Sequence, residues 1–142
     1  LVVGPAWLRD LVVNAARPFI YSTGPSPRLA RTVHRNIARL VAMDSERCAL
    51  SQSAAQLRND LRSLGFAIGA SNSQIIPIMI GSNERAIAYS NHLLAHGINA
   101  SPIRSPTVAR GAERLRLSLT ATIDEAAIAQ TLAALQEFCA ND

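Results

Sequence analysis

The chain has 142 residues, of which 49% are hydrophobic and 17% are charged, and its formal net charge is +4. This balance is typical of a folded domain of ordinary size and excludes a disordered chain. All fourteen basic residues are arginine, but they are scattered along the chain and only 4% of the residues are aromatic, which disfavours a nucleic-acid-binding surface.

The first third of the sequence predicts two short strands and two helices. Short apolar runs predict strands over residues 1–3 and 19–22. Pro5 suits the first turn of a helix that lies between these strands. Ser26 and Pro27 are typical of an N-cap and a first helical residue, and a stripe of apolar side chains continues that helix for about four turns.

The middle of the sequence predicts a helix, a strand and another helix. Apolar residues at spacings of three and four predict a helix over residues 50–64, and Gly65 is expected to end it. Residues 74–81 predict a buried strand, in which Pro77 indicates an edge position or a bulge. Asn83 is the expected N-cap of the next helix, and Gly97 closes that helix.

The last third predicts an extended segment, a strand and a final helix. Residues 98–108 are broken by prolines and are expected to be extended. Residues 114–120 alternate strictly, with leucines on one face and Arg114, Arg116, Ser118 and Thr120 on the other. Thr122 and Glu125 predict a capping box for the last helix.

Together these elements predict an α/β protein whose second half is an α+β domain, with a small, mostly antiparallel sheet covered by helices. A boundary is expected near residue 45, which divides the chain into residues 1–45 and 46–142.

No apolar run approaches the roughly 18 residues that a membrane span requires. Cys48 and Cys139 lack the spacing of metal ligands, so we expect free thiols, buried or half-buried, in a cytoplasmic protein.

Two places in the sequence are candidates for chemistry, although phosphate loops and common hydrolase motifs are missing. The hydroxyls of Ser22 and Thr23 precede a helix start, where they suit either a bound phosphate or a simple turn. Arg116 lies on the non-core face of its strand, where it suits either a carboxylate in a cleft or solvent.

The three histidines indicate no site of their own. His34, His92 and His96 fall on predicted helices without an obvious acidic partner. We therefore expect them to be surface or rim residues.

Several stretches resemble the α-oxoamine synthase family in the same order along the chain. They read NAARPFIYSTGPSP, IIPIMIGSNERAIAYSNHLLAHGI and IRSPTVARGAERLRLSLTA, and the final helix follows. Members of that family are pyridoxal-phosphate (PLP) enzymes of the aspartate-aminotransferase fold, fold type I. The resemblance implies that residues 1–45 are the end of the large PLP-binding domain with its linking helix, and that residues 46–142 are the C-terminal small domain.

The resemblance also implies the roles of individual residues. It places the Schiff-base lysine upstream of this chain, which contains no lysine, so we expect no catalytic residue in this segment and no activity from it alone. Arg116 would hold the carboxylate of the substrate, and Thr107 would lie near that substrate. Thr23, with Ser22 beside it, would reach the PLP phosphate across the interface of a homodimer.

The reaction that the resemblance implies is a decarboxylative condensation of an amino acid with an acyl thioester. The expected pair is L-alanine with pimeloyl-CoA, or with the pimeloyl-carrier protein, in biotin biosynthesis. Relatives that use glycine or another acyl donor remain the alternative within the family. A non-catalytic α/β binding module remains the alternative from another class.

Overall fold

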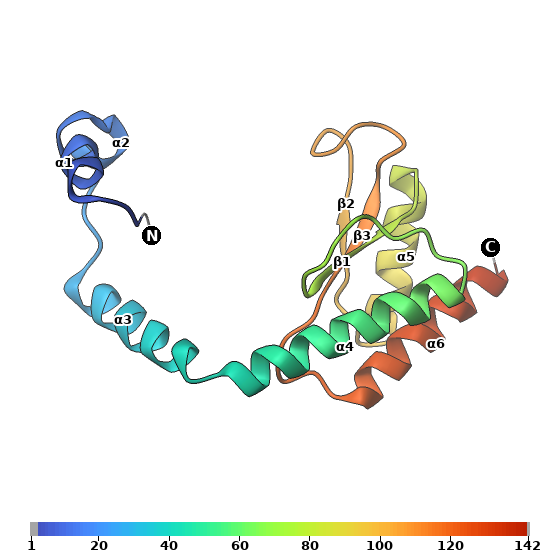
Figure 1. Cartoon of the computed structure of the whole chain (residues 1–142). Helices are drawn as coiled ribbons and strands as arrows, with labels where there is room; N and C mark the ends of the chain where they lie inside the picture. The colour runs from blue at the N-terminus through green and yellow to red at the C-terminus, as the bar shows by residue number, and fades with distance from the viewer. Residues whose placement is uncertain (1–2, 142) are drawn as a thin grey trace. The chain divides into compact units, whose positions relative to one another are not determined.

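The computed structural model describes residues 3–141, and the chain separates into two compact units between Met43 and Asp44 (Figure 1). Of the strand predicted over residues 1–3, residues 1 and 2 lie outside the described residues, and Val3 is not in a strand. Among the described helices, none combines the length and apolarity needed to cross a lipid bilayer.

The first unit consists of helices: α1 (Ala6–Ala15), α2 (Arg17–Ile20) and α3 (Pro27–Val41). The start of α3 confirms the sequence prediction, because Ser26 is its N-cap and Pro27 its first residue. The Ser26 hydroxyl accepts a hydrogen bond of 3.3 Å from the backbone N–H of Leu29.

The strand predicted over residues 19–22 is wrong, because the chain forms the short helix α2 there. Pro18 lies in the first turn of this helix, where its fixed φ is favourable and its missing N–H costs nothing. The backbone N–H groups of Ile20 and Tyr21 donate to carbonyl groups four residues earlier. A strand would need a partner, and the described part of the first unit contains no other strand.

The second unit combines three helices with a three-stranded antiparallel sheet in the order β1-β3-β2, which confirms the predicted architecture. β3 is therefore the central strand, and Pro77 lies in an outer strand, as its missing N–H requires. The elements are α4 (Asp44–Ser63), β1 (Ile75–Met79), α5 (Asn83–Ala95), β2 (Ser101–Ile103), β3 (Arg114–Ser118) and α6 (Glu125–Asn141).

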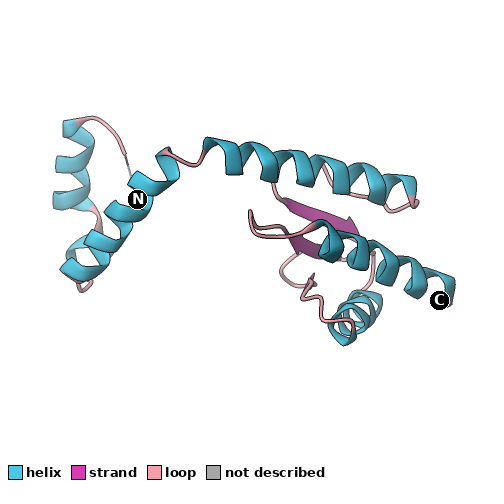
Figure 2. Ribbon diagram, turned by 90° about the horizontal axis from the view of Figure 1, so that it is seen from below, coloured by secondary structure: helices cyan, strands magenta, loops and turns pink. Residues whose placement is uncertain are grey.

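The core of the second unit lies between one face of the sheet and the helices. α4 contacts β1, α5 contacts β2 and β3, and α6 packs against α4 and α5 (Figure 2). The alternating leucines of β3 point into this core, as predicted. Its largest fully buried side chains are Leu61, Ile76, Ile78, Leu93, Leu115 and Leu135.

Glycines end two of the core helices, as the sequence predicted. Gly65 after α4 has φ +84° and Gly97 after α5 has φ +76°, a region that only glycine enters at no steric cost. The N–H groups of Phe66 and Ile98 then donate to the carbonyl groups of Leu61 and Leu93. This bond pattern satisfies carbonyls that would otherwise be left open at a helix end.

The predicted caps at the starts of α5 and α6 are wrong by one or two residues. Ser82, and not Asn83, caps α5, because its hydroxyl accepts from the N–H of Arg85 at 3.2 Å. Asp124, and not the pair of Thr122 and Glu125, caps α6, because its carboxylate accepts from the N–H of Ala127 at 2.8 Å. Adjacent residues compete for one cap, and the sequence pattern does not decide between them.

The start of α4 carries negative charge that suits the positive end of a helix dipole, since Asp44 and Glu46 lie in its first turn. The Ser45 hydroxyl donates to the Glu46 carboxylate at 2.7 Å. This hydrogen bond lowers the pKa of the Glu46 carboxyl from its usual value.

Candidate functional site

Arg116 occupies the middle of the central strand, on the face of the sheet opposite the core. Its register partners are Pro77 on β1 and Ser101 on β2. Its neighbours Leu115 and Leu117 are buried against the helices, so the alternation of the strand directs Arg116 away from them. The buried leucines therefore fix the side on which the guanidinium lies.

An open groove of about 350 Å³ runs along this face and contains Arg116. No acidic side chain lines it, and two guanidinium groups, those of Arg114 and Arg116, do. The groove is therefore electropositive and suits a carboxylate or another small anion. The other lining residues are Ser71, Ser73, Ile75, Pro77 and Ile103.

The two arginines of the groove differ in how they are held. Nε of Arg114 donates to the backbone carbonyl of Ala112 at 2.9 Å. Across residues 3–141, the Arg116 side chain makes no hydrogen bond or ion pair, and it is exposed. Its planar fork of donors therefore remains available for bidentate binding of a carboxylate.

Thr107 is exposed in the turn region between β2 and β3. It is not among the residues that line the Arg116 groove. The start of this connection is tied to α5, because the N–H of Ser105 donates to the side-chain oxygen of Asn83 at 3.1 Å. The proximity of Thr107 to a substrate stays a prediction.

Ser22 and Thr23 follow α2 in the first unit, and their hydroxyls are not equivalent. The Ser22 hydroxyl donates to the backbone carbonyl of Pro18, which uses its only hydrogen. Among the described residues, the Thr23 side chain makes no hydrogen bond and is exposed. Thr23 is therefore the better donor to a ligand, a distinction that the sequence alone did not make.

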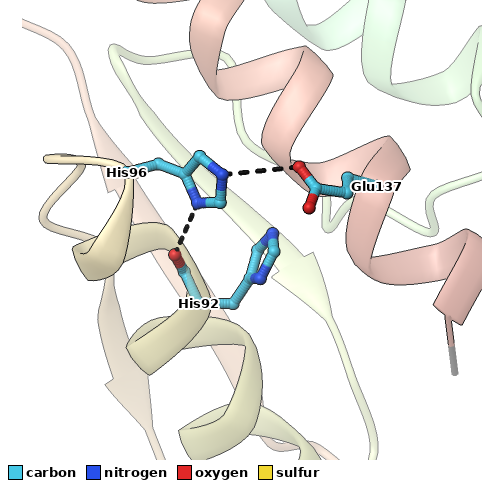
Figure 3. A group of neighbouring side chains, drawn as sticks. All are labelled: His92, His96 and Glu137. Atoms are coloured by element: carbon cyan, nitrogen blue, oxygen red, sulfur yellow. Dashed lines mark hydrogen bonds and ion pairs between the residues drawn. The ribbon is translucent and has the colours of Figure 1, made fainter.

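The expectation for the histidines is confirmed for His34, which is exposed on α3, and is incomplete for the other two. His92 and His96 are half-buried, and Nε2 of His96 lies 3.4 Å from a carboxylate oxygen of Glu137 (Figure 3). The sequence offered one indication of this cluster: two histidines four residues apart in one predicted helix, and a glutamate in the final helix.

Both cysteines are free, as expected, but they are exposed and not buried or half-buried. Cys48 lies in the second turn of α4, and Cys139 lies near the end of α6. The apolar stripes of these helices face the core through other residues, such as Leu57 and Leu135. A cysteine at roughly helical spacing can thus fall just outside the buried arc of its helix.

Comparison with known proteins identifies the class to which this fold belongs. Residues 1–135 match the family described as aminotransferase class I and II, so the chain belongs to that family. The structure is similar to a structure of serine palmitoyltransferase (SPT) with a PLP internal aldimine, with a TM-score of 0.86 at 27% identity, over 95% of this chain and 34% of that one. The fold is therefore part of the PLP-dependent fold type I.

Within this class, the relatives and solved structures that the chain resembles are α-oxoamine synthases. A putative 8-amino-7-oxononanoate synthase of Desulfosudis oleivorans is 42% identical over 80% of this chain and 30% of its own length. The 8-amino-7-oxononanoate synthase of Cellvibrio japonicus is 37% identical over 96% of this chain and 34% of its own length. The 8-amino-7-oxononanoate synthase of Francisella tularensis shares the fold, with a TM-score of 0.81 at 20% identity, over 96% of this chain and 40% of that one. The chain spans about a third of the length of the curated relatives it matches.

The residues present fit one end of PLP only. Residues 11–43 contain five arginines and no acidic residue, and Thr23 stands between Arg17 and Arg28 in the sequence, so the net charge of this segment suits a phosphate dianion. The chain contains no lysine, so none of its side chains can form a Schiff base with the cofactor. What the side chains of this chain can supply is therefore limited to ligands of the phosphate and of the substrate.

Proposed function

We propose that this chain is the C-terminal third of an 8-amino-7-oxononanoate synthase, which condenses L-alanine with pimeloyl-CoA or the pimeloyl-carrier protein and releases CO₂. The observation that carries this proposal is the unpaired guanidinium of Arg116 in a groove without acids. The names of the relatives, at 37% and 42% identity, support the choice of amino acid and acyl donor. The expected cytoplasmic location and homodimer belong to the same proposal.

Arg116 binds the carboxylate of the amino acid through two parallel N–H···O bonds. A planar fork fixes the carboxylate plane, and so it also fixes the rotation of the α-carbon substituents. When bound, PLP supplies an electron sink for the electrons of the broken α-bond. Arg116 then determines which α-bond is aligned with that sink, so one charge contact gives both affinity and orientation.

Thr23 donates a hydrogen bond to the PLP phosphate, and the neighbouring N-terminus of α3 adds a favourable dipole. Ser22 has a supporting role, because its hydroxyl holds the end of α2 through the carbonyl of Pro18. In this proposal the phosphate belongs to the cofactor of the other subunit of a homodimer.

The test is a substrate survey with the complete gene product, including whatever is encoded before Leu1. L-Alanine, glycine and L-serine are each assayed against pimeloyl-CoA and shorter and longer acyl thioesters, with release of CO₂ and of free thiol as readouts. We expect L-alanine with the pimeloyl thioester to give the highest kcat/KM. A preference for glycine or serine would assign the chain to another enzyme of the same family. L-Serine is included because the structure is similar to that of SPT.

The alternative function, a binding module without catalytic activity, is tested by examining the coding sequence upstream of Leu1 and the complete gene product. The enzyme requires a lysine upstream of Leu1 that forms the Schiff base with PLP. A start codon close to Leu1, or no PLP absorbance in the complete product, would favour the module and overturn the enzyme.

A further inference from the structure

A cluster of metal-ligating side chains lies on the helical layer of the second unit, formed by elements other than the strands that carry the Arg116 groove. His92 lies in the last turn of α5 and His96 is the C-cap of that helix, and Glu137 reaches toward both from α6 (Figure 3). Each side chain brings one ligand atom within 4.8 Å of the other two. We propose that His92, His96 and Glu137 bind a divalent transition-metal ion of the Zn²⁺ type.

Hydrogen bonds to backbone carbonyls fix the tautomers of both imidazole rings. Nδ1 of His96 lies 2.9 Å from the carbonyl oxygen of His92, and Nε2 of His92 lies 3.0 Å from the carbonyl oxygen of Ala134. A carbonyl oxygen only accepts, so each of these nitrogens carries the proton. In the neutral ring the other nitrogen, Nε2 of His96 and Nδ1 of His92, then presents a lone pair, as in metal-binding histidines.

The lone pair of His96 faces an acceptor. With its proton on Nδ1, His96 directs Nε2 toward the carboxylate of Glu137, and these two atoms are 3.4 Å apart. Two ligands of a tetrahedral zinc ion, at ordinary Zn–N and Zn–O bond lengths, lie about 3.4 Å apart. A cation held by both atoms therefore fits the observed spacing with little movement.

The surroundings hold these side chains in place before any ion binds. The His92 and His96 rings pack together with centroids 4.5 Å apart, and the His92 and Phe138 rings form a T-shaped pair with centroids 5.2 Å apart. His96 and Glu137 keep 35% and 57% of their side-chain surface exposed, so an ion can reach them. The hydrogen bond from Nδ1 of His96 to the His92 carbonyl persists in the bound state, because it leaves Nε2 of His96 for the ion. His92, whose Nε2 is held by the Ala134 carbonyl, binds the ion through Nδ1 or exchanges that hydrogen bond for the ion.

The donor set selects the class of ion. Two imidazoles and one carboxylate suit Zn²⁺ and its neighbours among the transition metals, whereas Mg²⁺ and Ca²⁺ require oxygen ligands. Three protein ligands leave at least one coordination position for water. The ion would link α5 to α6 across 45 positions of sequence, from His92 to Glu137, and so stabilise the helical layer against unfolding.

The test is calorimetric titration of the 142-residue chain with Zn²⁺, and with Mg²⁺ as the negative control. We expect one Zn²⁺ per chain, no Mg²⁺ binding, and an unfolding temperature that rises with Zn²⁺ concentration. Co²⁺ serves as the spectroscopic probe and should show visible d–d bands without a thiolate charge-transfer band. A thiolate band would place the ion at Cys48 or Cys139 and overturn the proposal.

Matched variants locate the site. His96→Gln and Glu137→Gln should each lower Zn²⁺ affinity by about tenfold or more, while retaining the circular-dichroism spectrum of the folded chain. The controls are His34→Gln on α3 and Glu125→Gln at the start of α6, both exposed, and both should leave the affinity unchanged. If Zn²⁺ neither binds nor raises the unfolding temperature, His96 and Glu137 form an ion pair only and the metal site is wrong. Equal losses in the control variants would also contradict it.

Discussion

The two units of the chain contain similar helices but bury them very differently. Every buried residue among those described belongs to the second unit, whereas no residue of the described part of the first unit is buried. In α4 the apolar stripe is covered, and Leu57 and Leu61 are at most 2% exposed. In α3 the stripe is uncovered, and Leu29 is 53% exposed.

The difference shows that an amphipathic pattern predicts a helix and the face that it can bury, but not the partner that covers this face. α3 and α4 both carry apolar residues at helical spacing. The charges differ as well, since residues 1–43 hold six arginines and one aspartate, while residues 44–142 hold eight arginines and nine acidic residues. An uncovered apolar stripe beside a charge of +5 is expected of a segment whose packing partners lie elsewhere.

Producing the two units separately is the most direct test of whether the buried core belongs to the second unit alone. Residues 44–142 produced alone should keep a helical circular-dichroism spectrum and a cooperative thermal transition, because they contain the whole described core. Residues 1–43 alone should show little helix, because their helices have 10, 4 and 15 residues and isolated helices up to about 15 residues are marginal in water. A cooperative transition in the 1–43 peptide would contradict the comparison.

One leucine substitution in each unit compares how much burial contributes to the free energy of unfolding. Leu61→Ala should lower the free energy of unfolding of the 142-residue chain by about 2–5 kcal/mol, because Leu61 is fully buried. Leu29→Ala, on the uncovered stripe of α3, should change it by less than about 0.5 kcal/mol. Urea denaturation measures both values, and a comparable loss for Leu29→Ala would show that α3 is packed in solution.

Much of the second unit could be predicted because its local signals agree with its packing. Strict alternation placed the leucines of β3 in the core, and Gly65 and Gly97 ended helices where their φ values are positive. The strand expected at residues 19–22 failed because a short apolar run fits a strand and a helical turn equally well. Only backbone pairing decides between them, and this segment has no strand partner among the described residues.

The candidate site could be predicted in part. Alternation of β3 predicts that Arg116 and the leucines face opposite sides, and the structure agrees. The hydrogen bond from the Ser22 hydroxyl to the carbonyl of Pro18 could not be predicted, because it forms only when residues 17–20 are helical, and the sequence pattern predicted a strand there. The approach of Glu137 to His96 could not be predicted either, because it depends on how α6 packs against α5.

Arg116 provides the next test, in the unit that contains the buried core. Arg116→Lys in the complete enzyme should reduce kcat/KM by a transition-state loss of about 2–4 kcal/mol, because lysine keeps the charge but loses the bidentate fork. Steady-state kinetics over a range of amino-acid concentrations measures this loss. The control is Arg110→Lys, an exposed arginine in the turn before β3, which should leave kcat/KM nearly unchanged. Equal values for both variants would mean that Arg116 faces only solvent.

Thr23 provides the corresponding test in the uncovered unit, where the expected effect is smaller. Thr23→Ala in the complete enzyme should weaken PLP binding by about 1.5–3 kcal/mol, the value of a hydrogen bond to a charged group. Ser22→Ala should leave PLP affinity nearly unchanged and cost about 1 kcal/mol of stability, because the Ser22 hydroxyl is already used by the carbonyl of Pro18. Fluorescence titration of the apoenzyme with PLP measures affinity, and thermal unfolding measures stability. If Ser22→Ala lost as much PLP affinity as Thr23→Ala, the hydroxyl of Ser22 would have to leave Pro18 when the cofactor binds, and the assignment of the phosphate to Thr23 would be wrong.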